Sequence, residues 1–120
     1  MTMRTERVAS LLKEEVGMYL LREYRDSSLG FITVTDVHVT PDLRIAKIYV
    51  SIMGGKDVKG RTMKMLEANT PEIRSFIGGQ MRLKFTPEVH FYLDETLDRV
   101  EKIDRLIKQL HKDDPQKSPQ

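Results

Sequence analysis

The sequence contains no cysteine and no tryptophan. Without cysteine, disulfide bonds, thiolate zinc sites and cysteine nucleophiles are excluded, and the composition is compatible with a reducing cytosol. No apolar run approaches the roughly 18 residues that cross a membrane. The start, MTMRTERVAS, also lacks the apolar stretch of a secretory signal. We therefore expect a cytoplasmic protein that has no membrane partner and needs no metal to fold.

Histidines are few as well, and their pattern gives little support to an enzyme. The chain has three histidines. His90 and Asp94 share one expected strand face, and Asp36 and His38 share another, but two such residues without a defined third ligand fall short of a metal motif. No P-loop, nucleophile elbow or dinucleotide fingerprint occurs. We predict a protein without catalysis, metal, cofactor or small-molecule substrate.

The composition that is present is typical of one globular domain. Of the 120 residues, 39% are hydrophobic and 32% are charged, and the formal net charge is +2. A chain of this length can bury about two thirds of its unfolded surface in a single core. The last residues, HKDDPQKSPQ, have neither periodicity nor apolar content. We expect a domain over residues 1–111 and a flexible polar tail over residues 112–120.

Hydrophobic periodicity outlines the secondary structure. Apolar residues recur at steps of three or four, the helical period, in 5–25, 63–81 and 97–110. They alternate, as in half-buried strands, in 30–40, 44–53 and 89–93. In the first strand the alternation slips by one residue around Thr35 and Asp36, where a bulge would restore the inward facing. Residues 54–60, GGKDVKG, are expected to form a loop.

Proline divides the central helical segment. Pro71 disfavours helical geometry at Thr70, so two short helices meeting at a kink fit better than one helix. The kink residues are Ala68, Asn69, Thr70 and Pro71. We expect Thr70 to be the N-cap of the second helix and Pro71 its first residue. The predicted fold class is α+β, in the order α-β-β-α-kink-α-β with an additional C-terminal helix.

Charge is unevenly distributed along the chain. From Arg44 to Lys84 there are nine Lys or Arg and three Asp or Glu, a local balance of +6. From Glu88 to Asp104 there are six acids and two bases, a balance of −4. A positive stripe attracts polyanions through steering and counterion release, and nucleic acid is the commonest polyanion in a cytosol. From charge alone, a solvated face is an equally good interpretation.

Several spaced motifs follow one another between residues 4 and 97. Their residues are Arg4, Arg7, Val8, Val37, Val39, Asp42, Leu43, Ala46, Ile48, Tyr49, Val50, Ser51, Ile73, Arg74, Gly78, Met81, Arg82, Leu83, Lys84, Pro87, Glu88, Phe91 and Asp94. The element order resembles the type II KH domain, an RNA-binding fold, and the motifs resemble the bacterial ribosome-binding factor A family. The chain departs from that family at the kink, where the glycine of an A-x-G interruption is absent.

The resemblance implies a function. It implies a factor, monomeric when free, that binds the immature small (30S) ribosomal subunit and assists late maturation of 16S rRNA, including 5′-end processing and growth in the cold. The candidate RNA-binding residues are Arg4, Arg7, Lys47, Arg61, Lys64, Arg74, Arg82 and Lys84. The runner-up is a protein-docking module, in which the acidic last helix binds a basic partner and RNA plays no part.

Two features near the second central helix have alternative explanations. Arg82 and Lys84 are expected to end that helix, where they could stabilise its negative C-terminal pole or contact phosphates. Gly78 is expected inside the helix, where glycine costs about 1 kcal/mol relative to alanine. Close packing against the sheet, or close approach of an RNA backbone, would explain its presence.

Overall fold

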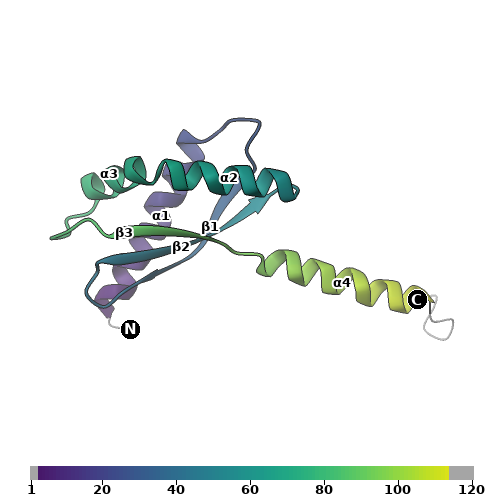
Figure 1. The fold of residues 1–120 in the computed structure, drawn as a ribbon. Coiled ribbons are helices and arrows are strands. Elements are labelled where there is room, and N and C mark those ends of the chain that lie inside the picture. Colours follow the sequence, from purple (N-terminus) through teal and green to yellow (C-terminus); the bar gives the residue numbers. More distant parts are fainter. Residues whose placement is uncertain (1–2, 114–120) are drawn as a thin grey trace.

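The computed structural model describes residues 3–113, except for the side chains of residues 97, 98, 101 and 111–113. Its elements are α1 (Met3–Glu23), β1 (Phe31–Val39), β2 (Ile45–Met53), α2 (Lys56–Ala68), α3 (Thr70–Gln80), β3 (Glu88–Leu93) and α4 (Thr96–Asp113). The helices α2 and α3 follow one another end to end beside β3 (Figure 1). This order confirms the predicted α+β, type II KH-like fold with an additional C-terminal helix.

The described strands form a mixed sheet in the order β1-β2-β3. β1 pairs antiparallel with β2, and β3 pairs parallel with β2. The register between β1 and β2 shifts between Val34 and Asp36, which confirms the bulge predicted there. Because of this shift, Ile32 and Val34 before the bulge and Val37 after it all point into the core.

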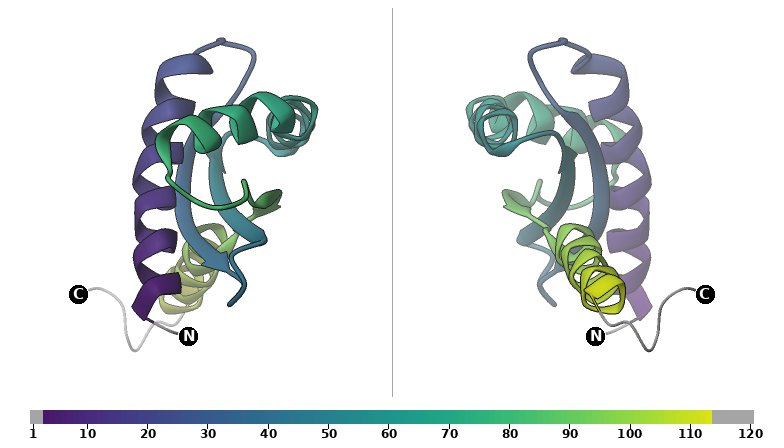
Figure 2. Two further views of the ribbon diagram at one scale, coloured as in Figure 1. Left: turned by 90° about the vertical axis from the view of Figure 1, so that its left-hand side faces the viewer. Right: turned by 90° about the vertical axis from the view of Figure 1, so that its right-hand side faces the viewer.

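One face of the sheet is buried beneath helices. α1 lies against β1, away from β3, and α2 and α3 cover the other strands (Figure 2). The core side chains without any exposed surface are Leu12, Val16, Ala46, Ile48, Val50, Leu66 and Ile73. They come from α1, α2, α3 and β2. Buried side chains of β1 and β3 belong to the same continuous core. The opposite face of the sheet carries the polar side chains of each strand and has an exposed Tyr92.

The kink between α2 and α3 is centred one residue earlier than expected. Asn69 is both the C-cap of α2 and the N-cap of α3, so Thr70 begins α3 and Pro71 is its second residue. The Asn69 Nδ2 donates to the Met65 carbonyl at 2.8 Å, and the Thr70 hydroxyl donates to the Leu66 carbonyl at 2.9 Å. These side chains therefore satisfy carbonyls in the last turn of α2.

The prediction of a loop over residues 54–60 is wrong, because α2 begins at Lys56. The chain leaves β2 through Gly54, whose φ of +136° lies in a region that favours glycine. The first turns of α2 are held by the buried Thr62, whose hydroxyl donates to the Val58 carbonyl at 2.7 Å and accepts from the Gly30 N–H at 3.0 Å. This long-range contact joins the first half of α2 to the residue that precedes β1.

The second central helix also ends earlier than expected, at Gln80. Met81 is its C-cap and has extended backbone angles, so Arg82 and Lys84 lie beyond the helix in an irregular segment, residues 81–87. Gly78 and Gly79 occupy the last turn, where their low helix propensity favours an end. The expectation that Arg82 and Lys84 end the helix is therefore wrong.

The last helix, α4, extends away from the sheet (Figure 1). Its start is anchored by Asp94, which accepts from the Thr96 N–H at 3.0 Å and from the Thr35 hydroxyl at 2.7 Å. Hydrogen bonds from the Thr96 side chain and from Thr35 lower the pKa of Asp94 to about 2. The predicted domain boundary after residue 111 falls inside α4, and residues 114–120 of the expected tail lie outside the described residues.

Candidate nucleic-acid interface

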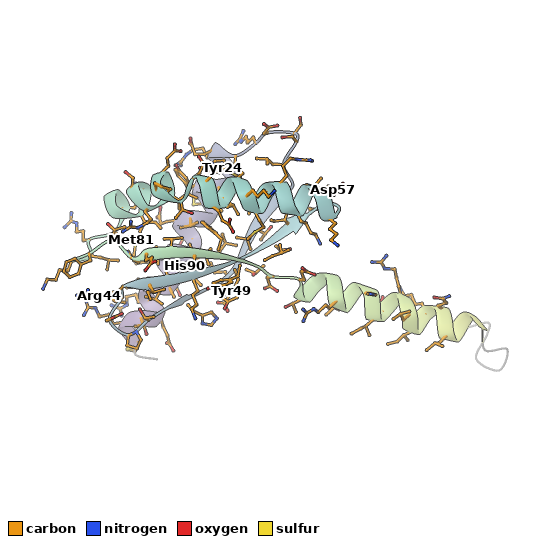
Figure 3. The ribbon with its side chains drawn as sticks, viewed as in Figure 1. Tyr24, Arg44, Tyr49, Asp57, Met81 and His90 are labelled. Carbon is orange, nitrogen blue, oxygen red and sulfur yellow. The ribbon has the colours of Figure 1, made fainter. Side chains whose placement is uncertain are left out.

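Basic side chains from three distant parts of the chain meet at one end of the molecule. Arg4 comes from the first turn of α1, Arg44 from the turn between β1 and β2, and Lys84 from segment 81–87. They line a hollow of about 320 Å³, which we call the basic hollow. Its lining residues are Arg4, Pro41, Asp42, Leu43, Arg44, Leu83, Lys84 and Phe85. Figure 3 shows Arg44 at the end of the sheet nearest to segment 81–87.

The basic hollow contains an exposed aromatic ring, that of Phe85. This side chain exposes 52% of its surface. The Arg44 Cζ lies 4.9 Å and the Lys84 Nζ 5.5 Å from the centre of the ring. Both distances are within the range of cation–π attraction. Phe85 therefore holds two cations beside an open ring surface.

The turn that carries Arg44 is held by a local hydrogen-bond network. An Asp42 carboxylate oxygen accepts from the Thr40 hydroxyl at 2.7 Å and from the Arg44 N–H at 3.1 Å. The Thr40 bond, followed by the Arg44 bond, lowers the pKa of Asp42 below its ordinary value. Leu43 has a φ of +61°, which is uncommon for a residue other than glycine, and its side chain is buried. The backbone under Arg44 is therefore tightly constrained.

The facing segment, 81–87, is attached to the same turn and to α3. Arg74 on α3 donates from Nε to the Pro87 carbonyl at 3.0 Å and from Nη2 to the Thr86 carbonyl at 3.2 Å. The Glu88 N–H, directly after the segment, donates to the Arg44 carbonyl at 2.7 Å. Arg74 thus positions the segment that carries Lys84 and Phe85.

Gly78 packs against segment 81–87. From the sequence, packing against the sheet was one of two explanations for this glycine. A Cβ atom added at Gly78 would lie 2.9 Å from the Thr86 hydroxyl oxygen, which is too close for van der Waals contact. The neighbouring Gly79 has no atom within 4 Å of such a Cβ. The absent side chain at Gly78 therefore allows α3 and segment 81–87 to approach each other.

The structure brings together only some of the predicted RNA-binding residues. Arg4 and Lys84 line the basic hollow. Arg61 lies elsewhere and donates from Nε to the Ser28 carbonyl at 3.0 Å. Lys47 lies on the uncovered sheet face, paired in register with His38 and His90. Of the other four, Arg74 supports segment 81–87. Exposed positions outside the basic hollow are occupied by Arg7 on α1, Lys64 on α2 and Arg82 in segment 81–87.

Arg44 and Phe85 were missed by sequence reasoning. A weak signal existed for Phe85, an aromatic residue directly after the basic Arg82-x-Lys84 pattern and outside any apolar period. Arg44 was counted in the positive stretch from Arg44 to Lys84, but no local pattern set it apart, because it gains its place only when β2 and segment 81–87 come together. Contacts between distant residues of this kind cannot be found from local patterns.

The histidines and carboxylates of the uncovered sheet face pair with each other. His38 Nε2 lies 3.0 Å from an Asp36 carboxylate oxygen, and His90 Nε2 lies 3.3 Å from a Glu88 carboxylate oxygen. Across residues 3–113, no three His, Cys, Asp or Glu side chains with described positions are grouped so that they could hold a metal ion. In that same part of the chain, no helix combines the length and apolar character of a membrane span.

Comparison with known sequences relates the chain to one family. The family described as "Ribosome-binding factor A" matches residues 4–107. A relative of that name from Staphylococcus saprophyticus is 41% identical over 114 residues, which cover 95% of this chain and 100% of the relative. The match therefore extends over nearly the whole of both proteins.

Solved structures show the same fold. The crystal structure of ribosome-binding factor A from Thermus thermophilus aligns with a TM-score of 0.64 and 16% identity, covering 74% of this chain and 94% of the other. A homology model of the Thermus thermophilus factor, fitted into a cryo-electron microscopy map of a 30S complex, aligns with a TM-score of 0.62 and 16% identity. That alignment covers 72% of this chain and 90% of the other.

Proposed function

Because the chain belongs to the ribosome-binding factor A family, we propose that it binds the small ribosomal subunit through the basic hollow. The observation that carries this proposal is the meeting of three cations from separate parts of the chain, Arg4, Arg44 and Lys84, in one hollow that contains an exposed aromatic ring. A related factor is described in complex with 30S, and its fold is the fold of this chain. The partner is therefore proposed to be the 16S rRNA of that subunit.

The proposed mechanism is binding without catalysis. Cations that neutralise RNA phosphates release condensed counterions, which favours association and makes it sensitive to salt. A factor that binds one conformation of the RNA more tightly than another shifts the population toward the first. We propose that this shift assists late maturation of 16S rRNA in the cytoplasm, including 5′-end processing, and that the need for it grows in the cold.

The predicted RNA-binding residues are not proposed to contribute equally. Arg4 and Lys84, with Arg44, have their charges gathered at the basic hollow. Arg61 and Arg74 already donate to backbone carbonyls, so we propose that they contribute mainly by holding segments in place. We propose peripheral phosphate contacts, which add affinity without sequence specificity, for Arg7, Lys47, Lys64 and Arg82.

Cosedimentation with purified small subunits at several salt concentrations tests the proposal. We expect the triple variant Arg4→Gln, Arg44→Gln, Lys84→Gln to bind more weakly than the parent. The slope of log affinity against log salt should fall by roughly 2 if all three cations contact phosphates, at about 0.7 per contact for single strands. Circular dichroism should first show that the variant is folded.

A matched control removes the same charge elsewhere. The variant Lys102→Gln, Arg105→Gln, Lys108→Gln takes three exposed cations from α4 and leaves the basic hollow intact. It should bind subunits nearly as the parent does. If this control loses binding while the first triple variant retains it, the cations of α4 contact the subunit in place of those of the basic hollow, and the proposed interface is wrong.

A further inference from the structure

We propose that Phe85 is a stacking surface for one unpaired base of single-stranded RNA, whose phosphates are held by Arg4, Arg44 and Lys84. The inference rests on the proposed function and names the ligand of the same site. RNA bases that are free of a helix stack on aromatic rings and on arginine guanidinium planes. Phe85 with Arg44 at 4.9 Å combines both kinds of surface.

The exposure of Phe85 is not explained by packing. The neighbouring Leu83 packs against the core and Pro87 is fully buried, whereas Phe85 between them leaves 52% of its surface exposed. An exposed aromatic ring makes no favourable contact of its own with a phosphate, whereas a base can stack on it and cover it. Base–aromatic stacking contributes about 1–3 kcal/mol per base, so one ring is enough to affect affinity.

The charge and size of the basic hollow fit a single nucleotide. Its lining carries the cations Arg4, Arg44 and Lys84 against one carboxylate, that of Asp42. Its volume of about 320 Å³ lies at the lower end of the range of about 300–1,000 Å³ that is typical of small-ligand sites. A duplex would present stacked bases that cannot reach the ring, since A-form RNA is read mainly through its shape, phosphates and 2′-hydroxyl groups.

Both walls of the basic hollow are held in place before any ligand binds. The Asp42 network constrains the turn under Arg44, and the two bonds of Arg74 hold the segment that carries Phe85. The Glu88 N–H joins the two walls through the Arg44 carbonyl. The cost of ordering the backbone is therefore met on folding, which favours binding of a small ligand.

The experiment compares two RNA probes of equal length and charge. One is a fluorescently labelled oligouridylate, and the other is the same ribose-phosphate chain without bases. We expect the full-length parent to bind the base-bearing probe about 5- to 150-fold more tightly, as the loss of one stacked base predicts. Phe85→Leu should remove most of this preference and leave the affinity for the abasic probe unchanged. Phe85→Tyr should retain the preference.

Phe31→Leu is the matched control, because Phe31 is similarly exposed, at 59%, and lines a different hollow. It should keep the parent's preference for bases. Equal binding of both probes by the parent would overturn the inference. So would an equal loss of both probes in Phe85→Leu, since Phe85 would then act only by placing the cations.

Small subunits provide the readout that separates this inference from the proposed function. Phe85→Leu should lower the affinity for subunits without changing the salt slope, because stacking releases no counterions. If Phe85→Leu binds subunits like the parent while the triple charge variant binds them weakly, the stacking inference fails and the proposed function stands. If neither variant changes subunit binding, both fail.

Discussion

At the scale of single residues, Gly78 and Gly79 are neighbours in α3 with different surroundings. Only Gly78 faces another segment, where the Thr86 hydroxyl would lie 2.9 Å from an added Cβ. Alanine in a helix interior is favoured over glycine by about 1 kcal/mol. Substitutions at these two positions can therefore distinguish the effect of helix propensity on stability from the effect of packing.

We predict opposite effects of alanine at these two positions. Gly79→Ala should raise the free energy of unfolding by about 0.5–1 kcal/mol, because its Cβ meets nothing. Gly78→Ala should be about 1–2 kcal/mol less stable than Gly79→Ala, because Thr86 or the helix must shift, as in an overpacked core. Urea unfolding followed by circular dichroism measures both.

A double-mutant cycle identifies the cause of the difference. Thr86→Ala removes the hydroxyl group that blocks a Cβ at Gly78. In the Thr86→Ala background, Gly78→Ala and Gly79→Ala should have similar effects, since the coupling is between neighbours in contact. A persistent difference between the two alanines would show that the close approach of segment 81–87 is not what requires glycine.

At the scale of elements, α4 differs from the other helices in what it buries. Its described apolar side chains, Val100, Ile103, Leu106, Ile107 and Leu110, leave 46–68% of their surface exposed. By contrast, Leu66 on α2 and Ile73 on α3 have no exposed surface. Because hydrophobic stabilisation scales with the area removed from water, α4 adds little to the stability of the domain.

We predict that ending the chain at Thr96 leaves the thermal midpoint within about 4 °C of the parent, a shift equivalent to about 1 kcal/mol or less. Thr96 is kept because its N–H donates to Asp94. Differential scanning calorimetry measures the midpoint. Ile77→Ala, which empties a buried site, should instead lower the unfolding free energy by about 2–5 kcal/mol. A large fall on truncation would mean that α4 packs against the domain in solution.

At the scale of the whole molecule, two of the surface hollows differ in chemistry. The basic hollow is lined by cations from α1, the β1–β2 turn and segment 81–87. The other, of about 570 Å³, is lined by the end of α1, the following loop and the start of β1. Leu20, Leu21, Tyr24 and Phe31 make its lining largely apolar. Of these two hollows, the basic hollow should therefore attract a polyanion more strongly.

Hydrogen exchange measured by mass spectrometry tests this orientation. On binding to small subunits, amide exchange should slow in residues 40–44 and 81–87, because bound RNA would cover both walls of the basic hollow. Exchange in residues 24–30, beside the apolar hollow, should be unchanged. The opposite pattern would place the subunit at the apolar hollow and contradict the proposed interface.

Local patterns in the sequence determined the order of the elements. The slip in alternation at Thr35 and the break at Pro71 both correspond to features of the fold, the bulge in β1 and the division between α2 and α3. Periodicity is informative there because each strand and central helix buries one face, and burial selects apolar residues at every second or every third and fourth position. The α+β fold class followed from that order.

The tertiary structure alone decided where helices end and which cations meet. Thr62 joins the first half of α2 to Gly30, and Arg74 becomes a support because it reaches the Thr86 and Pro87 carbonyls. These contacts join residues far apart in sequence, so no local pattern encodes them. The basic hollow has the same origin. Its cations are exposed and carry no periodic signal, and only the folding of three separate segments onto one end brings them around Phe85.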